Sequence, residues 1–311
     1  MTGSIHPARI ELEAVPAFND NYIWCFRRID SPLTWVVDPG QAAPAIAYLE
    51  TRGLKLAGIL LTHHHPDHTG GVGQLISECW HIEGECPVFG SRQSARADRI
   101  PHINRPLGAG EQFEAAGLTF ETLSVPGHTL DHVAFFTDSP LELANTHRLS
   151  VLEKAACGAD AVPPNGASAR PLLFCGDTLF SAGCGRLFEG TPEQMLNSLD
   201  SMASLPASTM VCCGHEYTLA NLAFTAGAWP DNKALPGYRD VCERLREAGE
   251  PTLPSSLAIE HRINPFMNPE LTRFTDSDTD NAENCGKGQR MPSADQRLQA
   301  FTQLRAAKDK A

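Results

Sequence analysis

The sequence lacks the patterns that would assign it to a membrane or to an export pathway. No apolar run approaches the roughly 20 residues that a helix needs to cross a bilayer. The first thirty residues contain no basic segment followed by an apolar core, so we expect no secretory signal. No CxxC pair occurs among the ten cysteines. This distribution favours reduced thiols and a cytoplasmic protein.

Positive charge is also scarce. The formal net charge is -12, which argues against nucleic acid or an anionic membrane as the principal partner, because both require a basic surface. A small anion could still bind at a local cationic patch. The "GKG" at 286–288 lacks the GxxxxGK[ST] spacing of a phosphate loop. With 42% apolar and 20% charged residues, the composition is that of an ordinary globular protein.

Strand signals dominate the first two thirds of the chain. Short β-rich runs occur at 21–26, 33–40 and 56–62, with a helix predicted over 42–53 that Gly53 would cap. Five further strands are expected at 86–91, 118–127, 132–138, 170–180 and 209–218. Many strands with few intervening helices predict an α/β (α+β) protein with two mixed sheets covered by helices.

The pattern changes near residue 217. Helical periodicity occupies 219–229, 232–249 and 294–310, so we predict one domain over 1–216 and a helical domain over 217–311. Two segments resemble insertions: 139–170 is rich in Ala, Pro and Gly, and 276–292 is polar. We interpret both as surface loops, as is usual for long connections of this kind.

One heptapeptide stands out. "THHHPDH" at 62–68 contains four histidines and one aspartate, and by itself it could be a metal site, a proton relay or a solvated loop. His63 and His65 are two residues apart, so on an extended segment both project to the same side while His64 points away. Pro66 favours a first helical turn, which brings the next carboxylate and imidazole, those of Asp67 and His68, to the same end of the preceding strand.

Three more ligand-type residues stand at expected strand ends. His128, Asp177 and His215 each follow an apolar run and a glycine. A glycine lets the backbone and a ligand approach a crowded centre closely. Together with the heptapeptide they make five histidines and two aspartates, a set suited to two hard or borderline dications.

These motifs resemble those of a known family. HxHxDH followed by His, Asp and His is typical of the metallo-β-lactamase superfamily. The segments "FNDNYIW", "THHHPDHTGG", "VPGHTLDH", "GDTLFSAGCGRLFEGT", "CGHEYT" and "NPFM" are together similar to glyoxalase II, the hydroxyacylglutathione hydrolases. The resemblance covers most of the chain apart from the two insertions. It implies an αββα sandwich, a C-terminal helical domain and a binuclear metal site at the edge of the sandwich.

The resemblance also implies a ligand assignment. One metal would be bound by His63, His65 and His128. The second metal would be bound by Asp67, His68 and His215. Asp177 would bridge the two, and Asp67 and Asp177 would hold the catalytic metal-bound hydroxide.

Three polar residues near these motifs fall outside the ligand set. We expect His64 and His132 to have a supporting or structural role. Asp38 ends the strand at 33–40 in an Asp-Pro-Gly turn. It could orient a ligand imidazole or cap its own turn, and the sequence does not favour either alternative.

The implied chemistry is hydrolysis. Metal coordination lowers the pKa of water to about 7, so hydroxide is available at neutral pH to attack a carbonyl that a metal polarises. A thioester suits such a site because a thiolate leaves without a strong general acid. No catalytic Ser or Cys is then required, and we interpret Cys175, Cys184 and Cys212 as small buried apolar residues.

Substrate recognition requires local positive charge. The resemblance indicates Arg186, Tyr217 and the pair Arg305 and Lys308 as residues that meet the glutathione carboxylates. The last two lie three apart on an expected helix and share a face. The resemblance also places Phe188 among the substrate-binding residues, but it stands where some family members have Tyr and has no hydroxyl that could donate a hydrogen bond.

The sequence therefore predicts a hydrolase that converts S-(R)-lactoylglutathione to glutathione and D-lactate, the second step of methylglyoxal detoxification. The alternatives are another activity on the same fold, sulfur dioxygenase or lactonase, or a metal-binding protein without catalysis. We expect two divalent ions per chain, with zinc first and iron or manganese suited to the same ligands. A monomer with a small-molecule glutathione thioester as its partner is expected, with no nucleic acid and no membrane.

Overall fold

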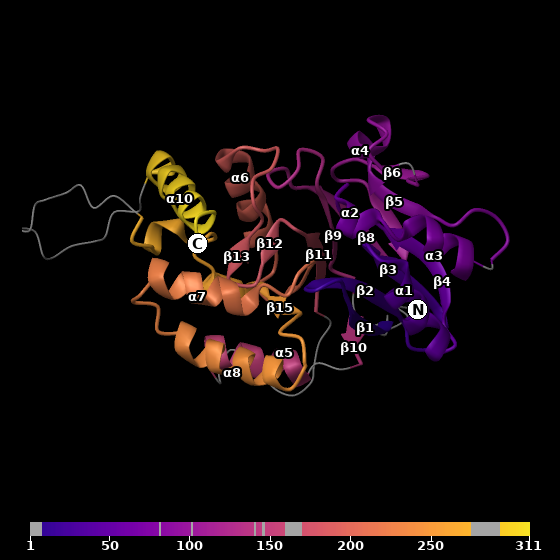
Figure 1. Ribbon diagram of the computed structural model, residues 1–311, viewed down its shortest axis with the longest axis horizontal. Helices are drawn as coiled ribbons and strands as arrows, with labels where there is room; N and C mark the ends of the chain where they lie inside the picture. The colour runs from indigo at the N-terminus through magenta and orange to yellow at the C-terminus, as the bar shows by residue number, and fades with distance from the viewer. Residues whose placement is uncertain are drawn as a thin grey trace, which may run out of the picture.

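A computed structural model describes most of the chain (Figure 1). The described residues are 8–80, 82–100, 102–139, 141–144, 147–158, 170–274 and 293–311. The predicted insertion at 276–292 lies outside them.

The first of two main sheets is formed mostly by the N-terminal third of the chain. Its strand order is β10-β1-β2-β3-β4-β5-β6, with β1 to β3 antiparallel and β3 to β6 parallel. The strands are β1 (Ala8–Ala17), β2 (Asn21–Arg28), β3 (Leu33–Val37), β4 (Lys55–Leu60), β5 (Val88–Ser91), β6 (Arg105–Leu107) and β10 (Leu141–Leu143).

The second sheet is built from later strands. Its order is β15-β14-β11-β9-β8-β7. The strands are β7 (Gln112–Ala115), β8 (Leu118–Ser124), β9 (Val133–Thr137), β11 (Leu172–Gly176), β14 (Met210–Cys213) and β15 (Ser255–Ser256). A separate two-stranded hairpin, β12 (Leu179–Phe180) and β13 (Gly183–Cys184), follows β11.

The two sheets pack face to face around aromatic side chains. Phe26 of β2 lies 5.6 Å from Phe120 and 5.2 Å from Phe174 of the second sheet, measured between ring centroids. All three are fully buried, and each such ring removes a large apolar area from water. Alternate residues of β8 face this core, as the burial pattern of the strand shows.

Helices cover the outer side of each sheet. The outer side of the first sheet is covered by α1 (Ala42–Thr51) and α3 (Val72–Cys79), whose buried side chains form a separate apolar cluster with β4. The short helices α2 (Pro66–Thr69) and α4 (Arg92–Arg96) follow β4 and β5. Strands β11 and β14 are buried on both faces, and α6 (Pro192–Ala203) packs into the same core through Met195 and Leu199. The predicted class, an αββα sandwich, is confirmed.

The C-terminal part is helical, as expected. It consists of α7 (Thr218–Ala228), α8 (Leu235–Glu247), α9 (Leu257–Ile263), the 3-10 helix η2 (Pro269–Leu271) and α10 (Ala294–Lys308). In Figure 1 these helices gather on the side of the sandwich opposite α1 and α3. Strand β15, however, pairs with β14 of the second sheet, so one sheet crosses the predicted boundary at residue 217. The division into 1–216 and 217–311 therefore stays a prediction.

The interpretation of 139–170 as a surface loop is wrong for its described part. Strand β10 pairs with β1, and helix α5 (His147–Cys157) packs against α8 and α9. Leu149 and Leu152 of α5 are buried, which explains why this segment is ordered. A partly buried ion pair, 2.6 Å between Arg170 Nη1 and Glu153 Oε1, joins α5 to the last residue of the insertion.

None of the helices in the described ranges has the length and apolar character required to cross a membrane.

Candidate metal centre

The heptapeptide forms the loop between β4 and α2. His63 and His65 face a common centre, with ring centroids 4.7 Å apart. His64 turns the other way, and its Nδ1 lies 3.3 Å from Asp131 Oδ1. Pro66 begins α2, as the sequence predicts, with Asp67 and His68 in that single turn. The expected orientation of the loop is therefore the one observed.

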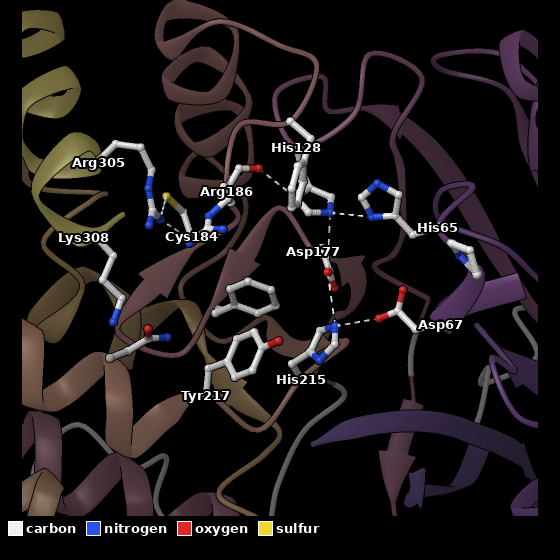
Figure 2. A pocket seen from close by; sticks show the side chains of 14 residues that line it. His65, Asp67, His128, Asp177, Cys184, Arg186, His215, Tyr217, Arg305 and Lys308 are labelled. Carbon is white, nitrogen blue, oxygen red and sulfur yellow. Dashed lines mark hydrogen bonds and ion pairs between the residues drawn. The ribbon is translucent and has the colours of Figure 1, made fainter. Parts of the chain in front are cut away.

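The predicted ligands lie in two compact trios, and Figure 2 shows His65, Asp67, His128, Asp177 and His215 turned toward one another at one side of the pocket. Ligand atoms of one trio lie within 4.8 Å of one another, and those of a second trio do likewise. The first trio is His63, His65 and His128; the second is Asp67, His68 and His215.

Asp177 lies between the two trios. Its Oδ2 is 3.6 Å from His128 Nε2 and 3.2 Å from His215 Nε2, and its Oδ1 is 3.4 Å from His68 Nε2. A carboxylate in this position can face two cations at once.

Several polar atoms of the cluster lack hydrogen-bond partners within it, and a bound cation would supply them with one. Within the described residues, His63 Nε2, His68 Nε2 and Asp177 Oδ1 are buried without a hydrogen-bond partner. Buried polar atoms normally have partners, because an unpaired one costs free energy. Three unpaired donor atoms around one centre are therefore what a metal site requires.

Oxygen acceptors fix the orientation of three imidazoles. Nδ1 of His68 donates to Asp38 Oδ2 at 3.0 Å, and Nδ1 of His215 donates to Asp20 Oδ1 at 2.9 Å. Nδ1 of His128 donates to the carbonyl of Arg186 at 2.8 Å. Each ring thereby keeps Nε2 as the acceptor that faces the centre.

Asp38 resolves the alternative that the sequence left open. Its carboxylate also accepts hydrogen bonds from the backbone N–H and hydroxyl of Thr62, at 2.8 and 2.7 Å. Its backbone is left-handed, with φ +51°, a conformation that Asp tolerates better than most residues. Asp38 thus orients the imidazole of His68, one of the predicted ligands, from across the loop.

Charge in the cluster favours cations. Burial raises the pKa of Asp177, but the facing imidazoles of His68 and His215 outweigh it and hold that pKa well below its usual range. Burial lowers the pKa of His215, but Asp177 and Asp67 outweigh it and raise the pKa to about 10. By contrast, burial and neighbouring imidazoles lower the pKa of His63. The carboxylates therefore attract positive charge to one side of the cluster.

Two of the three glycines that precede ligands permit close packing at the centre. A Cβ on Gly214 would lie 2.5 Å from Asp177 Oδ1, and one on Gly176, which has φ +48°, would lie 2.3 Å from Thr62 Oγ1. Gly127 has a different role, because its Cβ would meet Met195 of α6 at 2.8 Å. His132, expected to be a supporting residue, stacks on His63 at 4.6 Å and accepts the Asp177 N–H through Nε2 at 3.1 Å.

A pocket of about 510 Å³ opens from the centre toward the C-terminal helices. All five predicted substrate-binding residues line it: Arg186, Phe188, Tyr217, Arg305 and Lys308. Figure 2 shows Arg305 and Lys308 on the side of the pocket opposite His65 and Asp67.

Aromatic rings line the pocket beside the histidine cluster: Phe180, Phe188 and Tyr217. Tyr217 stacks on His215 with centroids 4.6 Å apart and an interplanar angle of 9°. Phe188 is 61% exposed and meets His65 and His128 edge-on at 5.4 and 5.3 Å. An exposed aromatic ring here forms a wall of the pocket.

Arg305 and Lys308 differ in their surroundings. Arg305 is only 6% exposed, and its Nη1 donates to the carbonyl of Cys184 at 2.9 Å. Lys308 Nζ donates to the carbonyl of Ala220 at 3.3 Å. Both line the same pocket, as their spacing predicts, but Arg305 also supports the hairpin beneath it.

That hairpin, residues 179–184, is held by polar side chains of the C-terminal helices. Glu260 of α9 accepts the Ala182 N–H at 2.9 Å. Asn264 Nδ2 donates to the carbonyls of Phe180 and Gly183 at 3.1 and 3.0 Å. Because Arg186 follows the hairpin directly, these contacts position the cationic end of the pocket.

Sequence reasoning missed three residues of the site. Asp20 holds His215, and Asn21 Nδ2 donates to Asp67 Oδ2 at 3.0 Å; both lie in the motif "FNDNYIW", which carried no residue-level assignment. Asn221 lines the pocket. It lies four residues after Tyr217 on α7, a spacing that places both on one helix face and could have identified it.

The comparisons with known proteins agree with this architecture. The family described as "Hydroxyacylglutathione hydrolase C-terminus" matches residues 216–311, and the metallo-beta-lactamase superfamily matches residues 34–140.

Two relatives illustrate the similarity. The hydroxyacylglutathione hydrolase of Chromohalobacter salexigens is 46% identical over 253 residues, 81% of this chain and 84% of the relative. That of Albidiferax ferrireducens is 45% identical over 266 residues, 86% of this chain and 89% of the relative.

Among solved structures, ETHE1 from Myxococcus xanthus aligns with a TM-score of 0.53 and 20% identity, covering 83% of this chain and 84% of the other. At that identity the match shows the shared fold alone.

Proposed function

The chain belongs to the hydroxyacylglutathione hydrolase family, and from this premise we propose that it hydrolyses the thioester of S-(R)-lactoylglutathione to glutathione and D-lactate. The protein is a hydrolase with the metallo-β-lactamase fold. The observation that carries the proposal is the junction of two features in one pocket: a buried His and Asp cluster at one end, and Arg186, Arg305 and Lys308 at the other.

The cluster binds divalent metal. In the proposed assignment one ion would be held by the trio of His63, His65 and His128 and the other by the trio of Asp67, His68 and His215, with Asp177 available to both. When bound, two such ions supply water of lowered pKa and polarise the thioester carbonyl. We propose zinc, and iron or manganese would suit the same nitrogen and oxygen donors.

The remaining residues orient and bind. Asp38 and Asp20 fix two imidazoles so that their Nε2 atoms face the centre. The cationic end binds the carboxylates of the glutathione moiety, which places the thioester carbonyl near the cluster. No acid is needed for the leaving group, since a thiol pKa of about 8.5 makes thiolate a good leaving group at neutral pH.

The test is an assay of the purified protein for loss of the thioester of S-(R)-lactoylglutathione, combined with metal analysis of the same sample. We expect turnover together with about two metal ions per chain. Metal bound without turnover would exclude this substrate, and assays for sulfur dioxygenation and lactone hydrolysis would then decide between the alternatives. No turnover of any of these would indicate a metal-binding protein without catalysis.

We also propose that the protein is a cytoplasmic monomer. Support for the compartment comes from the reduced state of the nine cysteines in the described residues, none of which is in a disulfide. One chain supplies the predicted ligand trios and all the predicted substrate-binding residues, so a single copy suffices to form the proposed site. Size-exclusion chromatography with light scattering tests the oligomeric state.

A further inference from the structure

A carboxylate at the end of the last helix joins two arginines of the pocket. Asp309 follows α10 as its C-cap residue. Its Oδ1 accepts a hydrogen bond from Arg305 Nη2 at 3.0 Å and another from Arg186 Nε at 3.2 Å. Arg186 and Asp309 are 123 residues apart in the chain, so the fold and not local sequence brings them together.

Stabilisation of helix α10 does not explain why an aspartate stands at its C-terminal end. The C-terminus of a helix carries a partial negative charge and favours cations. An Arg that precedes an Asp by four residues is also the weaker orientation of that pair on a helix. The negative charge of Asp309 is therefore unfavourable at this end of α10. Its favourable interactions are those with the guanidinium groups of Arg186 and Arg305.

The contacts leave the terminal donors of Arg186 available, whereas both terminal nitrogens of Arg305 are already in hydrogen bonds. Arg186 uses only Nε in a hydrogen bond, and across the described part of the chain its two terminal nitrogens have no hydrogen-bond partner. Its side chain is 57% exposed and lines the pocket. Arg305 Nε is buried and likewise has no partner in the described residues. The terminal fork of an Arg is the group that binds a carboxylate with two parallel hydrogen bonds.

We propose that Asp309 is a positioning residue for substrate binding, which holds Arg186 against Arg305 so that the free end of the Arg186 guanidinium meets a carboxylate of the substrate. This inference rests on the proposed function, because it assigns a role within the glutathione-binding end of the pocket. Without Asp309, the exposed Arg186 side chain would sample many rotamers, and ordering it on binding would reduce affinity.

A rival role for the same carboxylate makes the opposite prediction. If Asp309 only competed with the substrate for the two arginines, removing it would free them and lower KM. If Asp309 positions them, removing it raises KM even though the pocket becomes more positive. The sign of the change in KM therefore separates the two roles.

The experiment measures KM and kcat for S-(R)-lactoylglutathione with metal-loaded wild type, Asp309→Ala and Asp309→Asn. We expect Asp309→Ala to raise KM about fivefold with kcat within about twofold of wild type, as for a partly exposed ion pair acting only on binding. Asp309→Asn should recover most of the loss, because the amide oxygen still accepts both hydrogen bonds. Asp295→Asn, at the other end of α10, is the matched control for the change in charge and should leave KM unchanged.

Two further measurements separate an effect on substrate binding from effects on folding and on turnover. Thermal unfolding of Asp309→Ala should show a stability close to that of wild type, because the loss of two ion pairs at a partly exposed carboxylate is offset by the removal of an unfavourable charge at the helix end. Calorimetric titration with S-hexylglutathione, which has no thioester to hydrolyse, should show the same loss of affinity as KM does.

The double variant Arg186→Ala/Asp309→Ala should bind S-hexylglutathione with an affinity within about twofold of that of Arg186→Ala. The second substitution should add little, because Asp309 acts largely through Arg186. An unchanged or lower KM in Asp309→Ala, or fully additive losses in the double variant, would overturn the inference. Absence of turnover in wild type with S-hexylglutathione still bound would refute the proposed function, and the calorimetric series would still test Asp309.

Discussion

Asp38 and His68, thirty residues apart, are joined by a hydrogen bond of 3.0 Å from His68 Nδ1 to Asp38 Oδ2. This bond fixes which ring nitrogen of His68 faces the cluster. Asp38→Asn keeps the size and the left-handed backbone, but its NH2 group cannot accept from Nδ1. We expect metal affinity to fall by roughly 10- to 100-fold. Competition with a chelator measures it, with the exposed Asp30→Asn as control, and equal metal retention in both variants would contradict the assigned role.

Asp177 faces both trios, so its removal should affect both ions together. Asp177→Ala is expected to lose metal and hydrolysis in parallel, because the shared carboxylate is also the main negative charge in the cluster. Metal analysis by mass spectrometry and the thioester assay on the same preparation check this. Asp138→Ala, an exposed carboxylate after β9, is the matched control. Retention of full metal content by Asp177→Ala would refute a shared ligand.

Arg305 should contribute more to substrate binding than Lys308. Its guanidinium is nearly buried, and it supports the Cys184 carbonyl beneath the pocket, whereas Lys308 contacts one carbonyl at 3.3 Å. We expect Arg305→Ala to raise KM about tenfold and Lys308→Ala about threefold, with kcat little changed. Steady-state kinetics measure both, and thermal unfolding shows whether Arg305→Ala is folded. An unchanged KM in folded Arg305→Ala would place the glutathione end elsewhere.

Helix α5 should stabilise the fold although it lies in an insertion. Leu152 is fully buried and the adjacent Val151 is 37% exposed, so the two positions compare a buried and an exposed apolar side chain on the same helix. Leu152→Ala should lower the free energy of unfolding by about 2 to 5 kcal/mol, and Val151→Ala by no more than about 0.5 kcal/mol. Urea unfolding tests this. Similar small effects at both positions would show that α5 packs loosely.

Glu260 should make stability depend on pH. Burial raises its pKa to about 6 from 4.5, so the folded chain binds this proton more tightly than the unfolded chain does. Below about pH 4.5 the carboxyl is protonated in both states, and its ionisation does not affect stability. As pH rises through 6, its ionisation lowers the free energy of unfolding by about 2 kcal/mol.

Glu260→Gln removes this titration but keeps an oxygen that accepts the Ala182 N–H. The difference in unfolding free energy between the variant and wild type should therefore increase as pH rises from about 4.5 to 6. Above that range the difference should stay constant. Urea unfolding of both proteins across pH 4 to 7 measures the difference, and a difference independent of pH would contradict the raised pKa of Glu260 in the folded chain.

The sequence identified the predicted metal ligands more completely than the residues that hydrogen-bond to them. The ligands stand at strand ends beside Pro66, Gly176 and Gly214, where local chemistry and strand alternation predict their direction. Their partners Asp20 and Asp38 come from distant loops, and only the sheet topology sets those distances. The pairing of Arg186 with Asp309 is long-range for the same reason.

Among the helices that the sequence analysis missed, α5 and α6 were missed for different reasons. Helix α6 begins with a capping box between Thr191 and Gln194, a local signal that "TPEQ" makes readable. Helix α5 has no such signal, because its apolar face is short and its stability comes from packing against α8 and α9. The Ala, Pro and Gly content around it favoured a loop, and tertiary contacts outweighed that preference.

Strand β15 has a consequence for how the chain can be divided. It is the last strand of the second sheet and pairs with β14 through Ser255 and Ser256, which come from beyond the predicted boundary. A fragment ending at 216 would leave the backbone groups of β14, an entirely apolar strand, unpaired at an open edge. Such an edge recruits strands from other molecules. The last third of the chain thus keeps the sandwich from self-association as well as lining the pocket.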